Sequence, residues 1–315
     1  MRLSVFTSIA FVLGLPWACT DTAESAQPCA DCADTRNFGV VVPDAGVASG
    51  TEDVDTIAPP ATIDDALAAL NTQRIASGLE PVTLDDELTA GCELHIDYMA
   101  GEGKVVHEQT STSAFYTERG ADAGPRSLIA GDVYDLKEAI ALWTEGLYHR
   151  VALLDSGTSV IGLAFRDGYA CLDPFGKWDE ASADTGPLYP GKGQTDIPTT
   201  LNAAASPISP VPGDWDAPTG TVVSIGFPAA STMGDSPVLE VLSMTSGALV
   251  DGTIRHPSDL DDPYAALLGS TVALVPRKPL APGTTYQAEF RGEIDGQEVN
   301  RIWQFSTAPE VSPAP

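Results

Sequence analysis

The chain has 315 residues, a length that allows about two domains. Its 44 acidic and 16 basic residues give a formal charge of −28. A surface this acidic repels phosphate backbones and anionic lipid headgroups, so we expect no nucleic-acid partner, although adaptation to a salty medium would produce the same charge.

The N-terminal segment is typical of a secretory signal, which we place at residues 1–18. Arg2 precedes an apolar stretch over residues 5–15, which is shorter than the roughly 20 residues that span a bilayer. The small residue before Cys19 resembles the end of a bacterial lipobox. We therefore expect Cys19 to be acylated, giving an exported, membrane-anchored envelope lipoprotein that faces the periplasm or the exterior. Pro16 stands where a lipobox usually has leucine, and plain secretion is the alternative.

The five cysteines agree with export into an oxidising compartment, because four remain once Cys19 carries a lipid. Cys29 and Cys32 form a C-x-x-C pair without nearby basic residues, which favours a local disulfide over a redox or zinc site. Cys92 and Cys171 either pair within the first domain or remain free and buried.

Composition divides the remainder of the chain into five segments. Residues 19–60 are acidic and rich in small residues, so they form a flexible tether. Residues 61–178 form the first folded domain, and the prolines of residues 179–218 indicate an extended linker. Residues 219–308 form a second folded domain, and residues 309–315 form a tail.

Three helices are predicted in the first folded domain. The first begins after Thr62, a capping residue with Asp65 three positions on, and ends near Gly78. A second follows Pro81, and a third begins at Asp135 and continues through Leu147. Each has apolar residues at three- and four-residue steps, which would place them on one buried face.

Strands follow the helices in both parts of the chain. Short strands at residues 160–165 and 169–172 close the first domain, which indicates an α/β sandwich. From Gly220 onward the pattern is entirely β, and Asp295-Gly296 between short alternating segments predicts a hairpin. We interpret this part as an immunoglobulin-like sandwich without an inter-sheet disulfide. Its strands are expected at residues 221–227, 238–244, 271–275, 285–290 and 302–307.

Several motifs of the first domain resemble bacterial members of the CAP superfamily, the SCP-like or cysteine-rich secretory proteins. The sharpest is Trp143-Thr144-Glu145-Gly146-Leu147-Tyr148-His149-Arg150, followed by an apolar run. The others are Leu70-Asn71-x-x-Arg74, Gly78-Leu79-x-Pro81, Asp85-x-x-Leu88 and His95-x-x-Tyr98-Met99. The resemblance implies a three-layer α-β-α sandwich whose cleft carries two histidines and two acids and often binds a divalent cation.

The resemblance also implies where the cleft residues would fall. His107 would be the first histidine and His149 the second. One family acid is replaced by Ser127, and Glu145 lies near the second acid, although Gly146 aligns better there. Trp143 and Arg150 complete the candidate cleft.

The candidate ligands limit what kind of metal site this chain could form. Two imidazoles and the Glu145 carboxylate could hold a zinc-like ion, whereas His107 and His149 alone would hold it weakly. Simpler interpretations are a loop position for His107, a hydrogen-bonding role beside Trp143 for His149, and a structural ion pair for Arg150.

Three functions follow from these observations. The favoured one is a non-enzymatic protein whose cleft binds a small or hydrophobic molecule, a lipid or an envelope polymer, with the β domain as a spacer or adhesive module. The second is a metal-assisted hydrolase with His107 and His149 as ligands and Glu145 as acid or base. The third is a structural adhesin.

Overall fold

The computed structural model describes residues 59–175, 186–202, 208–215 and 218–310. The predicted signal, most of the tether, and Cys19, Cys29 and Cys32 lie outside these residues. No helix within the described part of the chain combines the length and the apolar character that crossing a bilayer requires.

Helix-capping residues define the first two long helices, and the sequence predicts the cap of the first. Helix α1 (Ile63–Ala76) starts with a capping box, in which Thr62 and Asp65 bond each other's backbone N–H groups. Helix α2 (Asp86–Glu102) begins at Asp85, whose carboxylate accepts hydrogen bonds from two N–H groups of the first turn. It ends at Gly103, which adopts a left-handed conformation with φ of 64°.

The third predicted helix is divided into two, which corrects the expectation of one helix through Leu147. Helix α4 (Leu136–Glu145) is capped by Asp135, and helix α5 (Leu147–Leu153) follows directly. Gly146 separates them because its ψ of 116° is extended rather than helical. A short helix α3 (Glu118–Ala123) and the one-turn η1 (Gly124–Arg126) were not predicted.

The first sheet has the strand order β1-β3-β4-β2. Its strands are β1 (Thr83–Leu84), β2 (Leu128–Ala130), β3 (Val160–Arg166) and β4 (Tyr169–Asp173). Strand β1 runs parallel to β3, and the other neighbours are antiparallel. The predicted strands at residues 160–165 and 169–172 are therefore confirmed as β3 and β4.

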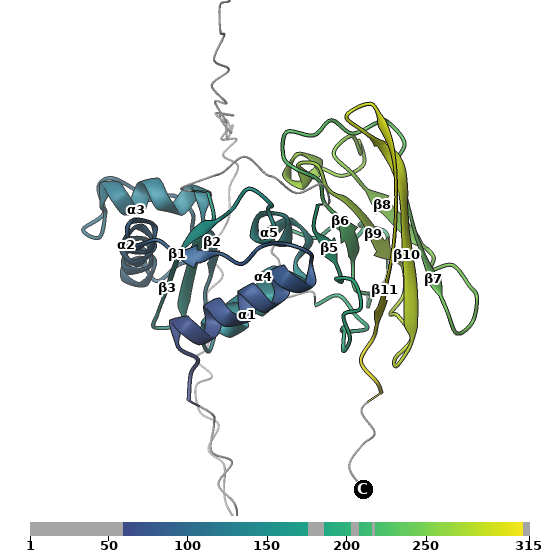
Figure 1. Cartoon of the computed structure of the whole chain (residues 1–315). Helices are drawn as coiled ribbons and strands as arrows, with labels where there is room; N and C mark the ends of the chain where they lie inside the picture. Colours follow the sequence, from purple (N-terminus) through teal and green to yellow (C-terminus); the bar gives the residue numbers. More distant parts are fainter. Residues whose placement is uncertain (1–58, 176–185, 203–207, 216–217, 311–315) are drawn as a thin grey trace, which may run out of the picture. The chain divides into compact units, whose positions relative to one another are not determined.

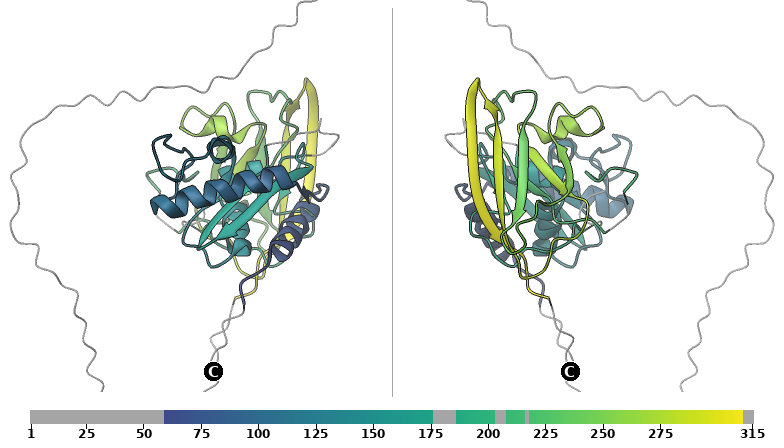
Figure 2. Two further views of the ribbon diagram at one scale, coloured as in Figure 1. Left: turned by 90° about the vertical axis from the view of Figure 1, so that its left-hand side faces the viewer. Right: turned by 90° about the vertical axis from the view of Figure 1, so that its right-hand side faces the viewer.

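Helices cover both faces of this sheet, so the first half is a three-layer α-β-α sandwich (Figure 1). Alternate strand residues make the two cores. Ile129, Ala164 and Cys171 pack against α2, which crosses the sheet in the left view of Figure 2. Leu128, Leu163 and other residues of the opposite face pack against α1 and α4.

The second half consists of two β-sheets around one apolar core. One sheet has the order β11-β10-β7 and the other β5-β6-β9-β8. The strands are β5 (Leu188–Tyr189), β6 (Val223–Ile225), β7 (Val238–Ser243), β8 (Gly252–Arg255), β9 (Val272–Pro276), β10 (Thr285–Ile294) and β11 (Gln297–Ser306). The predicted β-rich half is confirmed, and β5 and β8 are additions to the predicted strands.

The predicted hairpin at Asp295-Gly296 joins β10 to β11. Ile294 pairs with Gln297, so the loop between the strands contains only Asp295 and Gly296. Both have positive φ, 53° for Asp295 and 73° for Gly296, as a two-residue turn of this kind requires.

Part of the proline-rich segment belongs to the β half. Leu188 and Tyr189 form β5, which pairs with β6, and Ile197 bridges Thr307 beside β11. The N–H of Leu188 also donates to the carbonyl of Ser77 at the end of α1, at 3.0 Å. The described part of this segment therefore packs against both halves.

Candidate functional site

Helix α5, which carries the sharpest sequence motif, packs against the β half. Leu147 and Tyr148 share one apolar cluster with Val222, Leu268 and residues of β9. Residues 57–315 form one compact unit by their contacts. The helix is thus a structural link between the two halves.

A buried hydrogen bond extends this link. The hydroxyl of Tyr148 lies 2.9 and 2.8 Å from the two carboxylate oxygens of Asp262 and donates to this group. Burial, and then the neighbouring Asp262 carboxylate, raise the pKa of Tyr148 above its usual value. Tyr148 therefore stays protonated and serves as a donor.

Arg150 is a second link and is only 2% exposed. Its guanidinium donates to the carbonyl of Thr144 at 3.1 Å and to that of Val222, in the β half, at 3.2 Å. It also lies over the ring of Tyr189, 3.9 Å from the ring centre. Burial lowers the pKa of Arg150 to about 10, so the group remains charged at neutral pH. Its donors are engaged by these carbonyl oxygens and by the side chain of Tyr189, and its charge also acts on the nearby Glu145 carboxylate.

Glu145 lies at the end of α4, close to the same contacts. Burial raises the pKa of its carboxyl, while a hydrogen bond from the side chain of Asn202 and the charge of Arg150 oppose this rise. Glu145 therefore faces Asn202, a residue outside the stretch that resembles CAP proteins.

His107 lies in the exposed loop after α2, with its Nδ1 3.0 Å from the carbonyl oxygen of Gly124. The neighbouring His95 is fully buried, and its Nε2 lies 2.9 Å from the carbonyl of Val106. Gln109 donates to the other ring nitrogen of His95 at 3.1 Å. These hydrogen bonds of His95 hold the loop against α2. The other candidate histidine, His149, is a half-buried residue of α5.

Ser127 and Trp143 belong to the core of the first half. The Ser127 hydroxyl donates to the carbonyl of Ala123 at 2.8 Å and lies 3.9 Å from the sulfur of Cys92. Trp143 is 1% exposed and donates from its ring nitrogen to the carbonyl of Ile129 at 3.3 Å. Both residues therefore stabilise the packing of the first half.

Cys92 and Cys171 form a disulfide that joins α2 to β4. This pairing is one of the two alternatives that the sequence leaves open. Both sulfur-bearing residues are fully buried in the core on the α2 face of the sheet.

The candidate metal ligands are not assembled into a cluster. Within the described ranges, no three His, Cys, Asp or Glu side chains are placed to hold a metal ion together. His107, His149 and Glu145 therefore do not form the three-ligand set that the sequence suggests for zinc.

We expect zinc titration of the full chain, followed by calorimetry, to show no micromolar binding that His107→Ala or His149→Ala removes. His256→Ala, in the β half, is the matched control. Loss of a micromolar site in either of the first two variants, with the control unchanged, would contradict this expectation.

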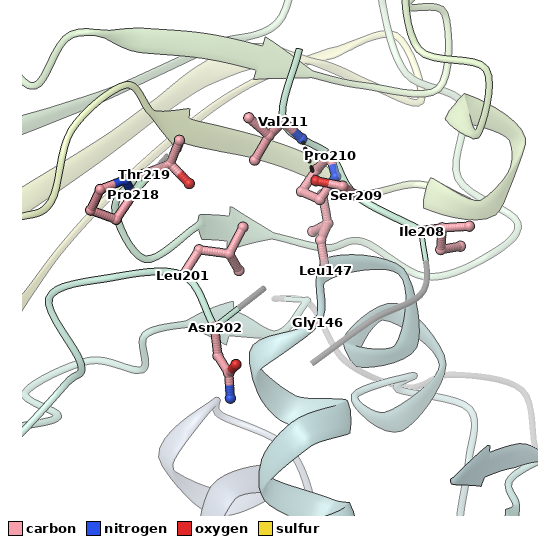
Figure 3. Close-up of a pocket in the computed structure, with 10 residues that line it drawn as sticks. All are labelled: Gly146, Leu147, Leu201, Asn202, Ile208, Ser209, Pro210, Val211, Pro218 and Thr219. Carbon is pink, nitrogen blue, oxygen red and sulfur yellow. Dashed lines mark hydrogen bonds between the residues drawn. The ribbon is translucent and has the colours of Figure 1, made fainter. Parts of the chain in front are cut away.

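A cavity of about 260 Å³ opens beside the start of α5 (Figure 3). Leu147 rises from this helix toward Pro210, and Leu201 points into the same space, whereas the side chain of Asn202 points away toward the helices. The described lining residues are Gly146, Leu147, Leu201, Asn202, Ile208, Ser209, Pro210, Val211, Pro218 and Thr219. Most of the lining side chains are apolar.

Most of this cavity is not predicted from the sequence, because the prolines of residues 179–218 indicate an extended linker. One signal was present: Leu201, Ile208 and Val211 are apolar residues between the prolines. A solvated linker has little need of such residues, whereas a segment that packs against a helix does.

The comparison with protein families agrees with the geometry of the first half. Residues 67–172 match the model of the CAP family, described as the cysteine-rich secretory protein family. The chain thus contains a CAP domain, as its motifs indicate, and the match covers about a third of its length. No curated protein matches the chain.

Proposed function

We propose that this protein is an exported CAP-domain protein that binds a small neutral apolar molecule and does not catalyse a reaction. The cavity beside α5 is the observation that carries this proposal. Leucine, isoleucine, valine and proline side chains surround it, and such a lining favours apolar ligands. Its volume of about 260 Å³ is slightly below that of typical drug-sized sites, which favours a compact ligand over a whole lipid.

Charge supports a neutral ligand over an anionic one. The chain carries a formal charge of −28, and Glu145 lies behind Asn202 at the edge of the cavity. A carboxylate ligand would be repelled on approach and would find no cation among the described lining residues. Fatty-acid anions are therefore poor candidates, and neutral alcohols, esters or aromatic molecules are better ones.

The proposal includes the place where the protein works. The N-terminal signal pattern and Cys19 support export and attachment to an envelope membrane, facing the periplasm or the exterior. The two-sheet half is proposed to be an immunoglobulin-like module that holds one wall of the cavity. In this view it takes part in ligand binding, and a pure spacer or adhesin role is the lesser alternative.

Fluorescence of a neutral naphthylamine dye tests the proposal. We expect a saturable rise in dye fluorescence with the full chain, and we expect octanol to displace the dye better than octanoate. Leu201→Trp should fill the cavity and abolish the signal, because Leu201 points into it (Figure 3). Leu260→Trp is the matched control, since Leu260 is 99% exposed. Unsaturable binding, or equal binding by both variants, would reject this site.

A further inference from the structure

We propose a second binding site, in which the carboxylate of Glu145 binds the ammonium group of a small organic amine with an apolar body. The site is a cavity of about 280 Å³ between α1, α4 and residues 194–198. It lies on the other side of the Glu145–Asn202 hydrogen bond from the cavity of Figure 3 and shares no described lining residue with it.

One wall of this second cavity lies outside the stretch that matches the CAP family. Tyr189 and residues 194–198 supply it. The side-chain amide of Gln194 donates to that of Gln73 on α1 at 2.9 Å, and the N–H of Gly191 donates to Gln194 at 2.8 Å. The wall is therefore held against α1 by hydrogen bonds, and the cavity exists before a ligand enters.

Most polar groups around the cavity already have partners. The hydroxyl of Thr144 donates to the carbonyl of Ile140 at 2.7 Å, and the amide of Gln73 donates to Ser77 at 3.0 Å. The ring of Tyr189 is covered by Arg150. These groups shape the wall and contribute little to ligand recognition.

Three charged side chains remain on the lining: Lys137, Glu145 and Asp196. Lys137 and Asp196 are exposed, whereas Glu145 is partly buried. A carboxylate offers about four acceptor positions, and the Asn202 side chain occupies one of them. Arg150 donates to backbone carbonyls and to the side chain of Tyr189 and acts on Glu145 through its charge, so the carboxylate retains acceptor capacity for a further donor.

An ammonium group suits this carboxylate in charge and in donor number. Its three N–H donors match an acceptor-only group, and partial burial of Glu145 strengthens the attraction over that at an open surface. The overall negative charge of the chain also raises the local concentration of cations. The apolar residues on the lining would contact the body of the amine; they are Ala69, Ile140, Ala141, Ile197 and Pro198.

Three probes that share an isopentyl group test the proposal by calorimetry and chemical-shift mapping on the full chain: isopentylamine, isopentyl alcohol and isocaproate. We expect the amine to bind about tenfold more tightly than the alcohol, because one charge-assisted hydrogen bond contributes about that much to affinity. Isocaproate, an anion, should not bind. Glu145→Gln should reduce amine affinity to that of the alcohol. Glu298→Gln, an exposed change on β11, is the matched control.

The pH dependence gives a second readout. Because burial raises the pKa of Glu145, the carboxylate becomes protonated at a higher pH than an exposed glutamate does. Amine affinity should therefore fall as the pH is lowered through this raised pKa, and the affinity of the alcohol should not change. Equal binding of amine and alcohol at neutral pH, or an amine affinity unchanged in Glu145→Gln, would overturn the proposal.

Stability measurements separate a binding effect from a folding effect. The raised pKa means that folding disfavours the ionised form of Glu145, so its glutamine variant should be at least as stable as the wild type above that pKa. A lower melting temperature of Glu145→Gln at neutral pH would contradict this assignment. The naphthylamine-dye site has its own probe and its own variant, so either proposal can fail while the other holds.

Discussion

Arg150→Met should lower the free energy of unfolding by about 3–5 kcal/mol, because the carbonyls of Thr144 and Val222 would lose charged donors inside the protein. The methionine side chain retains an apolar stem but cannot bond these oxygens. Since Val222 belongs to the β half, we expect the loss to affect both halves in one transition. Urea unfolding followed by circular dichroism measures the change.

A surface arginine provides the control for this prediction. Arg166 forms an ion pair with Asp97 in which both side chains are about half exposed. Arg166→Met should cost less than about 1 kcal/mol, because exposed ion pairs contribute little. If the two variants lose the same stability, Arg150 is not the link between the halves that its contacts indicate.

Removing the disulfide should cost about 4 kcal/mol. Cys92 and Cys171 are 79 residues apart, and a cross-link over such a long loop restricts the unfolded chain strongly. We expect the double variant Cys92→Ala and Cys171→Ala to unfold at markedly lower urea concentration than the wild type. If the wild type is unfolded and its disulfide is reduced, its unfolding curve measured in reductant should match that of the double variant.

The other cysteines provide a control for this measurement. Cys29→Ser combined with Cys32→Ser leaves the Cys92–Cys171 bond intact and should change the unfolding curve little. Peptide mapping by mass spectrometry would find Cys92 and Cys171 in one linked peptide pair. A free thiol at Cys92 in the native protein would contradict the pairing.

The sequence alone predicted the elements whose causes are local. Thr62 and Asp135 are capping residues, and each side chain accepts a hydrogen bond from the N–H group three positions on. Asp295-Gly296 supplies the positive φ values of its turn without help from distant residues. The CAP domain was also recognisable, since its motifs occur in a characteristic order along the chain.

A local signal was also present where the prediction was wrong. Gly146 interrupts the helical pattern between Glu145 and Leu147, and glycine is a poor helix former. The apolar positions on either side suggested one continuous buried face. In the structure Leu147 begins α5, which packs against the β half, so its burial has a different cause.

The sequence by itself determined the α/β character of the first part, the β character of the second, the helices capped by Thr62 and Asp135, the hairpin and the CAP domain at residues 67–172. Tertiary structure alone decided the pairing of Cys92 with Cys171, the core position of Ser127, and the two cavities. The reason is the range of the interactions: capping acts within one helical turn, whereas Gln73 and Gln194, which close one cavity wall, are 121 residues apart. Contacts of that kind leave no periodic pattern, because packing of the complete chain brings the residues together.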